Sequence, residues 1–194
     1  AYTFDGTNDY ITTGDINTGS GGFEITNRIT VSCWAKSNSV NWSQTYANLV
    51  CKRDSSHYGF MLHTHPDKNI QFRIEAASSF HSGEYTMSDI QSWHLYTGIY
   101  DGSFTRLYVD GVEVINAAHS NKTIPSDTGP LRIGVDDYLF PHRTFNGSIS
   151  DVRVYNRALT SEEVYRLYDY GKFKHTEPMR ITSLSSTISS ANEN

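Results

Sequence analysis

Hydrophobic and polar residues alternate along much of this chain with the period of two that is typical of half-buried β-strands. Short clusters rich in Gly, Asp, Asn and Ser separate the strand-like segments, as in β-sandwich proteins. These segments span Tyr10–Thr13, Ile29–Lys36, Asn48–Lys52, Tyr58–Thr64, Ile70–Ala76, Trp93–Tyr100, Phe104–Val109, Val112–Asn116, Leu131–Val135 and Phe145–Tyr155. The pattern predicts an all-β protein in which antiparallel sheets pack face to face.

Two Asp-Gly pairs mark tight turns between neighbouring segments. Asp101-Gly102 and Asp110-Gly111 supply the positive φ angles that short hairpins require. The region Trp93–Asn116 is therefore expected to form a three-stranded meander.

One helix is expected near the C-terminus. Thr160 and Glu163 form a capping box, in which the Thr side chain caps the helix and the Glu side chain reaches back. Apolar residues follow at helical spacing, and Gly171 is expected to end the helix. Residues 172–194 are rich in Ser and Thr and lack apolar periodicity, so they are interpreted as a tail or linker after a domain of residues 1–171.

Composition narrows the class of partner. The chain has 194 residues, which suits one large β-sandwich, and a net charge of −5 with 16 Lys and Arg residues. Without a basic stripe, nucleic acid is excluded as an expected partner. No apolar run approaches the length of a membrane span, so no membrane partner is expected. Cys33 and Cys51 are too few for a disulfide framework, and either one bridge or two free buried thiols would fit.

Several motifs occur together in the order and spacing of one family. They are Tyr2–Ile11, Ile29–Trp34, Trp93-His94, Tyr100–Gly102, Leu107–Gly111, Leu131–Gly134 and Phe145–Glu163. Over about residues 1–170, the chain resembles the laminin-G-like, concanavalin A-like lectin/glucanase superfamily. The resemblance implies a two-sheet antiparallel jelly-roll β-sandwich with one short C-terminal helix, a concave face and variable loops. It also implies an extracellular, secreted or surface-exposed location, and attachment to other domains of a larger chain.

A sugar site is expected among the loops and on one strand face. An exposed aromatic ring offers a flat apolar platform on which the C–H face of a sugar stacks. Polar planar groups such as imidazole complete a shallow, hydrated site. The residues expected around the sugar are Trp42, Tyr46, His57, Tyr58, His63, Tyr138 and His142. For Trp42 the alternative is that the ring covers an edge of the core, and Trp34 and Trp93 are assigned to the core.

Asp151 is the candidate for a structural calcium site. Strand alternation in residues 149–155 turns its side chain away from the core, and calcium prefers several oxygen ligands. In the glucanase branch of the superfamily a similar Asp shares calcium with the N-terminal segment. The resemblance therefore implies that Asp5 and the region of Gly6 complete the metal site with Asp151. The alternative is that Asp151 pairs with Arg153.

Adjacent acids also precede Tyr138. Asp136 and Asp137 could ligate calcium or accept hydrogen bonds from sugar hydroxyls. The alternative is a solvated turn, since Asp is common in loops.

Catalysis is not expected. Glucanases of the superfamily carry two Glu residues on one strand face as nucleophile and acid, and no two Glu residues here have that spacing. Glu162 and Glu163 belong to the start of the helix, and no nucleophile elbow or phosphate loop is present. The sequence therefore predicts a non-catalytic carbohydrate-binding module whose partner is a glycan or polysaccharide. The alternatives are a structural or protein-interaction module of a virion or cell surface and, third, a polysaccharide hydrolase or lyase.

Overall fold

The computed structural model describes residues 1–13, 25, 27–42, 46–53, 59–75, 80–119, 123–124, 129–136 and 143–175. In these ranges the first sheet, called sheet I below, contains β1 (Tyr2–Asp5), β3 (Ile29–Ser37), β9 (His94–Tyr100), β10 (Phe104–Val109), β11 (Val112–Ala118) and β13 (Asn146–Tyr155). The second, sheet II, contains β2 (Ile11–Thr12), β4 (Asn48–Arg53), β5 (Gly59–His65), β6 (Asn69–Glu75), β7 (Phe80–His81), β8 (Tyr85–Thr86) and β12 (Leu131–Ile133). Helix α1 spans Ser161–His175.

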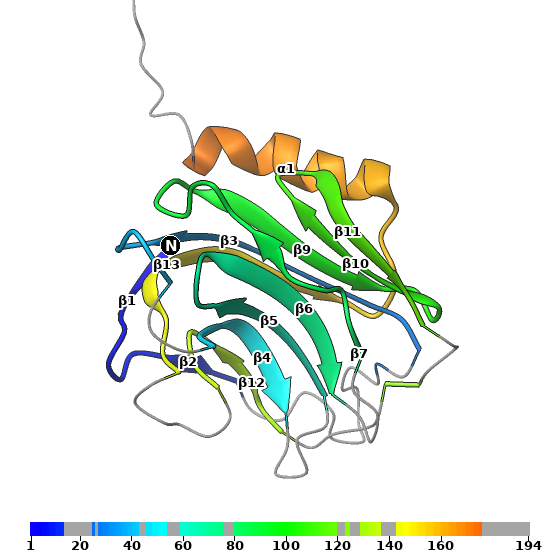
Figure 1. The fold of residues 1–194 in the computed structure, drawn as a ribbon, viewed down its shortest axis with the longest axis horizontal. Helices are drawn as coiled ribbons and strands as arrows, with labels where there is room; N and C mark the ends of the chain where they lie inside the picture. Colours follow the sequence, from blue (N-terminus) through cyan, green and yellow to red (C-terminus); the bar gives the residue numbers. More distant parts are fainter. Residues whose placement is uncertain are drawn as a thin grey trace, which may run out of the picture.

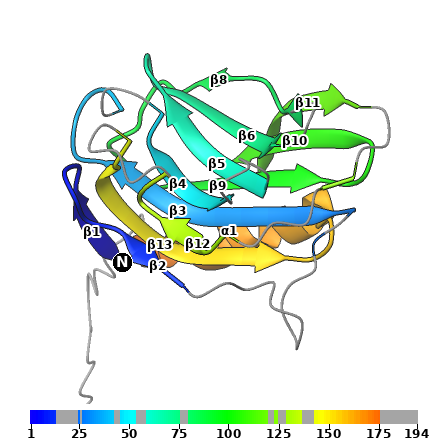
Figure 2. The same cartoon turned by 90° about the horizontal axis from the view of Figure 1, so that it is seen from below.

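The two sheets pack face to face, and α1 lies along the outer side of sheet I (Figure 1). Seen from below, α1 lies behind β3 and β13 (Figure 2). The strand order is β1-β13-β3-β9-β10-β11 in sheet I and β2-β12-β4-β5-β6-β7 in sheet II, with β8 paired to β6. The predicted all-β, two-sheet fold is confirmed, and every predicted strand segment overlaps a strand. β7 and β8, of two residues each, are not among the predicted segments.

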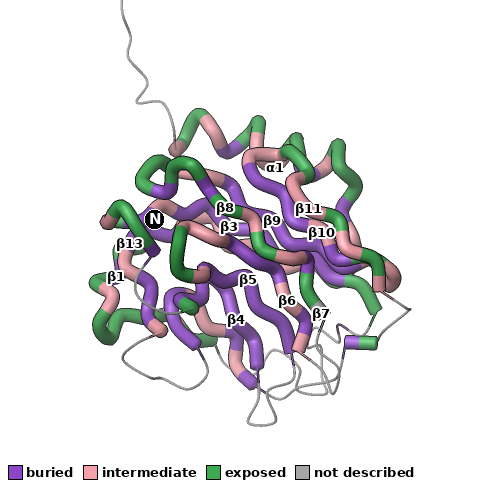
Figure 3. Tube along the Cα trace, in the orientation of Figure 1, coloured by how far each residue is buried: buried purple, intermediate pink, exposed green. Residues whose placement is uncertain are grey.

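Large apolar side chains from both sheets meet in one core. Phe4, Phe60, Phe72, Tyr96 and Phe145 are each at most 2% exposed. The buried residues follow the central strands of both sheets, whereas much of the outer side of α1 is exposed (Figure 3). Burial of this apolar surface is the main favourable contribution to folding.

Both cysteines are buried, and they form no disulfide bridge. Burial raises the pKa of the Cys33 thiol, because desolvation disfavours the thiolate. Of the two possibilities open from the sequence, the structure has two buried thiols and no bridge.

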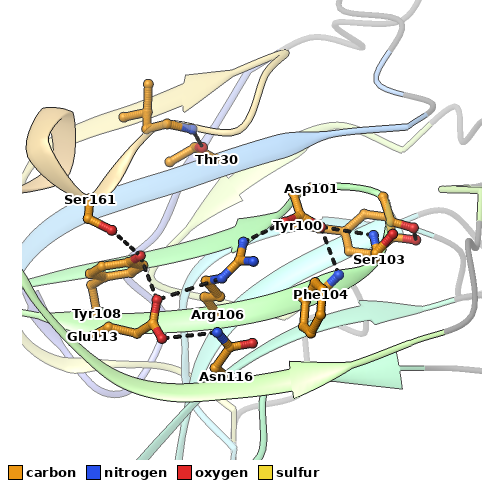
Figure 4. A network of polar contacts seen from close by, with 12 residues as sticks. Thr30, Tyr100, Asp101, Ser103, Phe104, Arg106, Tyr108, Glu113, Asn116 and Ser161 are labelled. Carbon is orange, nitrogen blue, oxygen red and sulfur yellow. Dashed lines mark hydrogen bonds and ion pairs between the residues drawn. The ribbon is translucent and has the colours of Figure 1, made fainter.

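The meander β9–β10–β11 has the predicted hairpins, and its polar side chains tie it to the helix (Figure 4). Arg106 donates to Asp101 over 2.6 Å and faces Glu113 at 3.6 Å. Glu113 accepts the hydroxyl hydrogen of Tyr108 over 2.7 Å, and that hydroxyl also lies 3.0 Å from the Oγ of Ser161. This chain of contacts fixes the start of α1 against sheet I.

The capping box at the start of α1 is confirmed. The backbone N–H of Glu163 donates to the Thr160 hydroxyl over 3.2 Å, and the Thr160 N–H donates to the Glu163 carboxylate over 2.9 Å. Arg157 adds two hydrogen bonds of 2.8 Å to the same carboxylate. These contacts favour the charged form and lower the pKa of Glu163 to about 2, with Arg157 as the largest cause.

Glu163→Gln is expected to lower the melting temperature at pH 7, because the folded state favours the ionised carboxylate. The folded pKa lies below the ordinary glutamate value of 4.5, so this contribution is present above about pH 4.5 and is lost as the pH falls towards 2. Melting curves of the parent and the variant should therefore converge over that interval. The exposed Glu162→Gln variant is the control, and a difference that stays constant with pH would contradict the assignment.

The predicted end of the helix at Gly171 is wrong, because the helix continues to His175. Gly171 instead allows a close approach: a Cβ atom there would lie 2.4 Å from the indole nitrogen of Trp34. The predicted domain boundary at 171 therefore falls inside α1, and residues 172–175 belong to the helix. No helix in the described ranges is long and apolar enough to cross a membrane.

Candidate functional site

The outer face of sheet II gathers polar side chains from adjacent strands. Alternation along β5 turns Leu62 into the core and His63 outward. The register places His63 opposite Asn48 of β4 and Gln71 of β6, so that all three share this outer face. A cavity of about 340 Å³ opens here, and the side chains that line it are Tyr46, Asn48, Arg53, Met61, His63, Arg73, Glu75, Asp136 and Arg143.

Ion pairs organise the wall of this cavity. Asp136 lies 2.6 Å from Arg143 and 3.5 Å from Arg53. Glu75 lies 2.8 Å from Arg73 and 3.6 Å from Arg53. The Arg53 and Asp136 side chains are 6% and 2% exposed, whereas those of Arg73 and Arg143 are 35% and 36% exposed. The buried Arg53 guanidinium therefore compensates the charge of the Asp136 and Glu75 carboxylates from inside the protein. The guanidinium groups of Arg73 and Arg143 reach the mouth of the cavity.

Two buried acceptor atoms of this wall have no hydrogen-bond partner within the described part of the chain. They are Oδ1 of Asn48 and Nδ1 of His63. Nε2 of His63 lies 3.1 Å from Oε1 of Gln71, and the Gln71 amide nitrogen lies 3.3 Å from His81, so we assign the His63 proton to Nε2. Burial, followed by the neighbouring His65, lowers the pKa of His63 to about 3. The ring is thus neutral at pH 7, and its Nδ1 is an acceptor.

Tyr46 places an aromatic ring at the rim. Its side chain is 42% exposed, and its ring packs edge-on against His65 at 4.5 Å between ring centres. The Arg143 guanidinium lies 5.8 Å from the centre of the Tyr46 ring, within cation–π range. Of the residues expected around a sugar, Tyr46 and His63 therefore line the same cavity.

Trp42 requires a correction. It is 3% exposed and packs in the core, with ring centres 6.2 Å from Tyr96 and 5.9 Å from Phe145. Its ring therefore offers no exposed platform, and the alternative of a core residue holds. The segment after β3 places the indole of Trp42 between the two sheets. The pattern of neighbouring residues in the sequence does not indicate this position.

The remaining predicted sugar contacts, His57, Tyr58, Tyr138 and His142, lie outside the described residues. Arg53, Arg73 and Glu75 also line the cavity and are not among the residues predicted from the sequence. For Arg73 and Glu75, the alternation of buried and exposed residues along β6 indicates their outward position. Ile70, Phe72 and Ile74 are buried, so the intervening residues of that strand share the outer face.

Asp136 is neither a solvated turn residue nor an exposed ligand. It is 1% exposed and belongs to the ion-pair network, in which Arg143 is its shortest ion-pair partner. Asp137 lies outside the described residues.

The predicted calcium site does not fit the strand register. Asp5 lies opposite Asn146, and Asp151 is further along β13, a separation of about 16 Å at roughly 3.3 Å per residue. Asp151 instead lies 3.8 Å from Arg153, as in the alternative drawn from the sequence. Asp5, Gly6 and Asp151 therefore cannot hold one ion together.

No group of three or more His, Cys, Asp or Glu side chains suited to a metal occurs in the described ranges. The expectation of one structural calcium ion stays a prediction, without an assigned site. Melting curves recorded with and without a chelator test it.

Two face-to-face antiparallel sheets, with one helix outside and a polar cavity on the opposite outer face, define a β-sandwich domain. Residues 5–165 match the family model Laminin_G_3, described as the concanavalin A-like lectin/glucanases superfamily. The chain belongs to this superfamily, which confirms the resemblance found in its motifs. No curated protein matches the sequence.

Solved structures share the fold at low identity. Domain 4 of AbnA, a GH43 extracellular arabinanase from Geobacillus stearothermophilus, in complex with arabinotriose, has a TM-score of 0.64 and 18% identity, over 86% of this chain and 75% of that one. The botulinum neurotoxin serotype D binding domain has a TM-score of 0.66 and 14% identity, over 87% and 41%. Domains LG4-5 of the mouse laminin alpha1 chain have a TM-score of 0.59 and 16% identity, over 81% and 43%. The chain thus spans less than half of the latter two, and these likenesses concern the fold.

Proposed function

We propose that this chain is a non-catalytic carbohydrate-binding module that holds its glycan on the outer face of sheet II. The observation that carries the proposal is the 340 Å³ cavity, where unpartnered acceptors of Asn48 and His63 lie among arginine side chains. A sugar hydroxyl both donates and accepts hydrogen bonds, so a polyhydroxylated ligand suits a wall of mixed polarity. The exposed ring of Tyr46 supplies a surface for the C–H face of a sugar.

The solved structures support a glycan as the ligand class. The arabinanase domain of the same fold is in complex with arabinotriose and comes from an extracellular enzyme. This likeness supports the proposal that the present domain acts outside the cell or on its surface and is joined to other domains of a longer chain. Function depends on the site rather than on the fold, so the identity of the sugar has to come from binding measurements.

The acids of the cavity argue for binding without catalysis. Glycoside hydrolysis requires one carboxyl group that holds a proton and a second that acts as base or nucleophile. Glu75 and Asp136 both form ion pairs with arginine side chains. Such pairing is expected of structural carboxylates and does not suit a group that has to hold a proton for catalysis. Incubation with a panel of polysaccharides is expected to release no reducing sugar. Release that disappears on Glu75→Gln would overturn the non-catalytic assignment.

A structural or protein-interaction module is the second candidate, and exposed aromatic residues on α1 favour it. Tyr165, Tyr170 and Phe173 are 52%, 65% and 65% exposed. Exposed apolar surface of this kind is a common feature of protein contacts. Absence of binding to every sugar on a broad glycan array would favour this candidate over the first.

Arg73→Gln is expected to weaken glycan binding about tenfold, because charge-assisted hydrogen bonds at the cavity mouth are lost. The variant and the parent are compared on the array and then by calorimetry with the tightest ligand. Arg166→Gln is the matched control, since Arg166 is 74% exposed on α1, on the other side of the molecule. Equal affinities for all three proteins would remove Arg73 from the site.

A further inference from the structure

The cavity on the outer face of sheet II carries more positive than negative charge, although the chain as a whole is acidic, with a net charge of −5. Its lining side chains include three guanidinium groups and two carboxylates, which belong to Arg53, Arg73, Arg143, Glu75 and Asp136. His63 adds no charge, because its pKa of about 3 leaves the ring neutral at pH 7. Among the described residues, the excess of positive charge at this cavity is therefore local.

The two carboxylates are shared among the three guanidinium groups. Glu75 pairs with Arg73 at 2.8 Å and Asp136 pairs with Arg143 at 2.6 Å. Each carboxylate also lies within 3.6 Å of the buried Arg53 guanidinium. The acids of the cavity therefore compensate its cations only in part, and the two more exposed cations, Arg73 and Arg143, lie at the mouth.

A further guanidinium group lies on the same face of sheet II. Leu131 and Ile133 of β12 pack on the core, so strand alternation turns Arg132 to the outer face. The Arg132 side chain is partly buried, and its Nη1 is buried without a hydrogen-bond partner in the described ranges. A buried donor without an acceptor is unfavourable, so an acceptor on a ligand would stabilise this group.

Arg132 and Arg73 lie in one row across the sheet. Arg132 lies opposite Cys51 of β4, Cys51 lies opposite Met61 of β5, and Met61 lies opposite Arg73 of β6. Figure 1 shows these four strands side by side. Three strand spacings of about 4.8 Å separate the two arginines, a distance of about 14 Å between their Cα atoms. One sugar ring does not span this distance, whereas an oligosaccharide does.

We propose that this face binds an acidic oligosaccharide whose uronic acid carboxylates contact the arginines of the row and of the cavity mouth. The inference rests on the proposed glycan function and names the ligand class of that same site. A guanidinium group matches a carboxylate with two parallel hydrogen bonds. The hydroxyl groups of the same sugars suit the unpartnered acceptors of Asn48 and His63. A uronic acid unit therefore supplies both kinds of group that this wall lacks within the described part of the chain.

The cavity on the outer face of sheet I provides a control. It has a volume of about 540 Å³ beside the end of α1, and Lys36 and Trp93 are among its lining residues. Trp93 was assigned to the core from the sequence, and this is wrong, since the residue is only partly buried. Lys36→Gln removes one cation from this other side of the molecule.

Calorimetry with oligosaccharides of glucuronic, galacturonic, mannuronic and guluronic acid tests the proposal, each beside its methyl ester. The ester removes the charge and keeps the sugar ring. In at least one pair, the acid is expected to bind about tenfold more tightly than the ester. This preference should shrink as salt rises from about 0.1 M to about 1 M, because the screening length falls from about 10 Å to about 3 Å.

Arg132→Gln should remove most of the preference for the acidic oligosaccharide. It should leave the affinity for the monomeric uronic acid unchanged, because one sugar in the cavity does not reach Arg132. Lys36→Gln should bind both like the parent. Equal affinities of the parent, Arg132→Gln and Lys36→Gln for the acidic oligosaccharide would overturn the extended site.

The ligand class and the glycan function fail in different ways. Esters that bind as tightly as all of the acids would overturn the acidic ligand class and leave the glycan function standing. Binding of no sugar at all, charged or neutral, would instead remove the glycan function itself.

Discussion

Trp42→Ala is expected to lower the free energy of unfolding by about 3–5 kcal/mol, the range for truncating a large aromatic residue in a packed core. The indole is 3% exposed and lies against Tyr96 and Phe145, so alanine would leave a cavity between the sheets. Urea denaturation of the parent and the variant measures the difference, provided that the slope is unchanged.

Tyr165→Ala is the control for this experiment, because Tyr165 is 52% exposed on α1. Its expected effect is within about 0.5 kcal/mol, as for most surface substitutions. A Trp42→Ala protein with the stability of the parent and a specific loss of glycan binding would contradict the core assignment. It would return Trp42 to the sugar site.

Asp136→Ala is expected to cost about 3–5 kcal/mol, because removing one partner of a buried ion pair leaves the other charge uncompensated. The Asp136 and Arg53 side chains are 2% and 6% exposed and lie 3.5 Å apart. Arg143 would lose its 2.6 Å contact with the same carboxylate. Thermal and urea unfolding both report this loss.

A double-mutant cycle separates this coupling from a general effect of truncation. Asp136→Ala combined with Arg53→Met is expected to be more stable than the sum of the two single changes implies, since no buried charge is then left alone. Strict additivity would show that the two side chains do not interact in solution. The ion pair between Asp136 and Arg53 would then make no contribution to the stability of the cavity wall.

Local patterns in the sequence were sufficient for the longer strands and the hairpins. The outward position of His63 follows from alternation along β5, and the reciprocal bonds of Thr160 and Glu163 follow from the spacing of a capping box. In each case the interacting residues are close together along the chain or lie on one strand, so their spacing in the sequence determines how their side chains are arranged.

The features that the sequence did not predict depend on contacts between segments that are far apart in the chain. Gly171 continues the helix because Trp34 of β3 packs against it, a contact that no helix-end rule includes. Asp136 is buried because Arg53 and Arg143 approach it from other parts of the chain. The proposed calcium pair failed for the same reason, since the register of β1 against β13 sets the distance between Asp5 and Asp151.

Amide chemical-shift mapping with a neutral oligosaccharide tests the central claim most directly. The ligand is the tightest neutral sugar on the glycan array. The largest shifts are predicted in β4, β5 and β6 around His63 and Arg73, with smaller ones in Arg73→Gln and unchanged ones in Arg166→Gln. Shifts confined to α1 and β9, with none on the outer face of sheet II, would contradict the account.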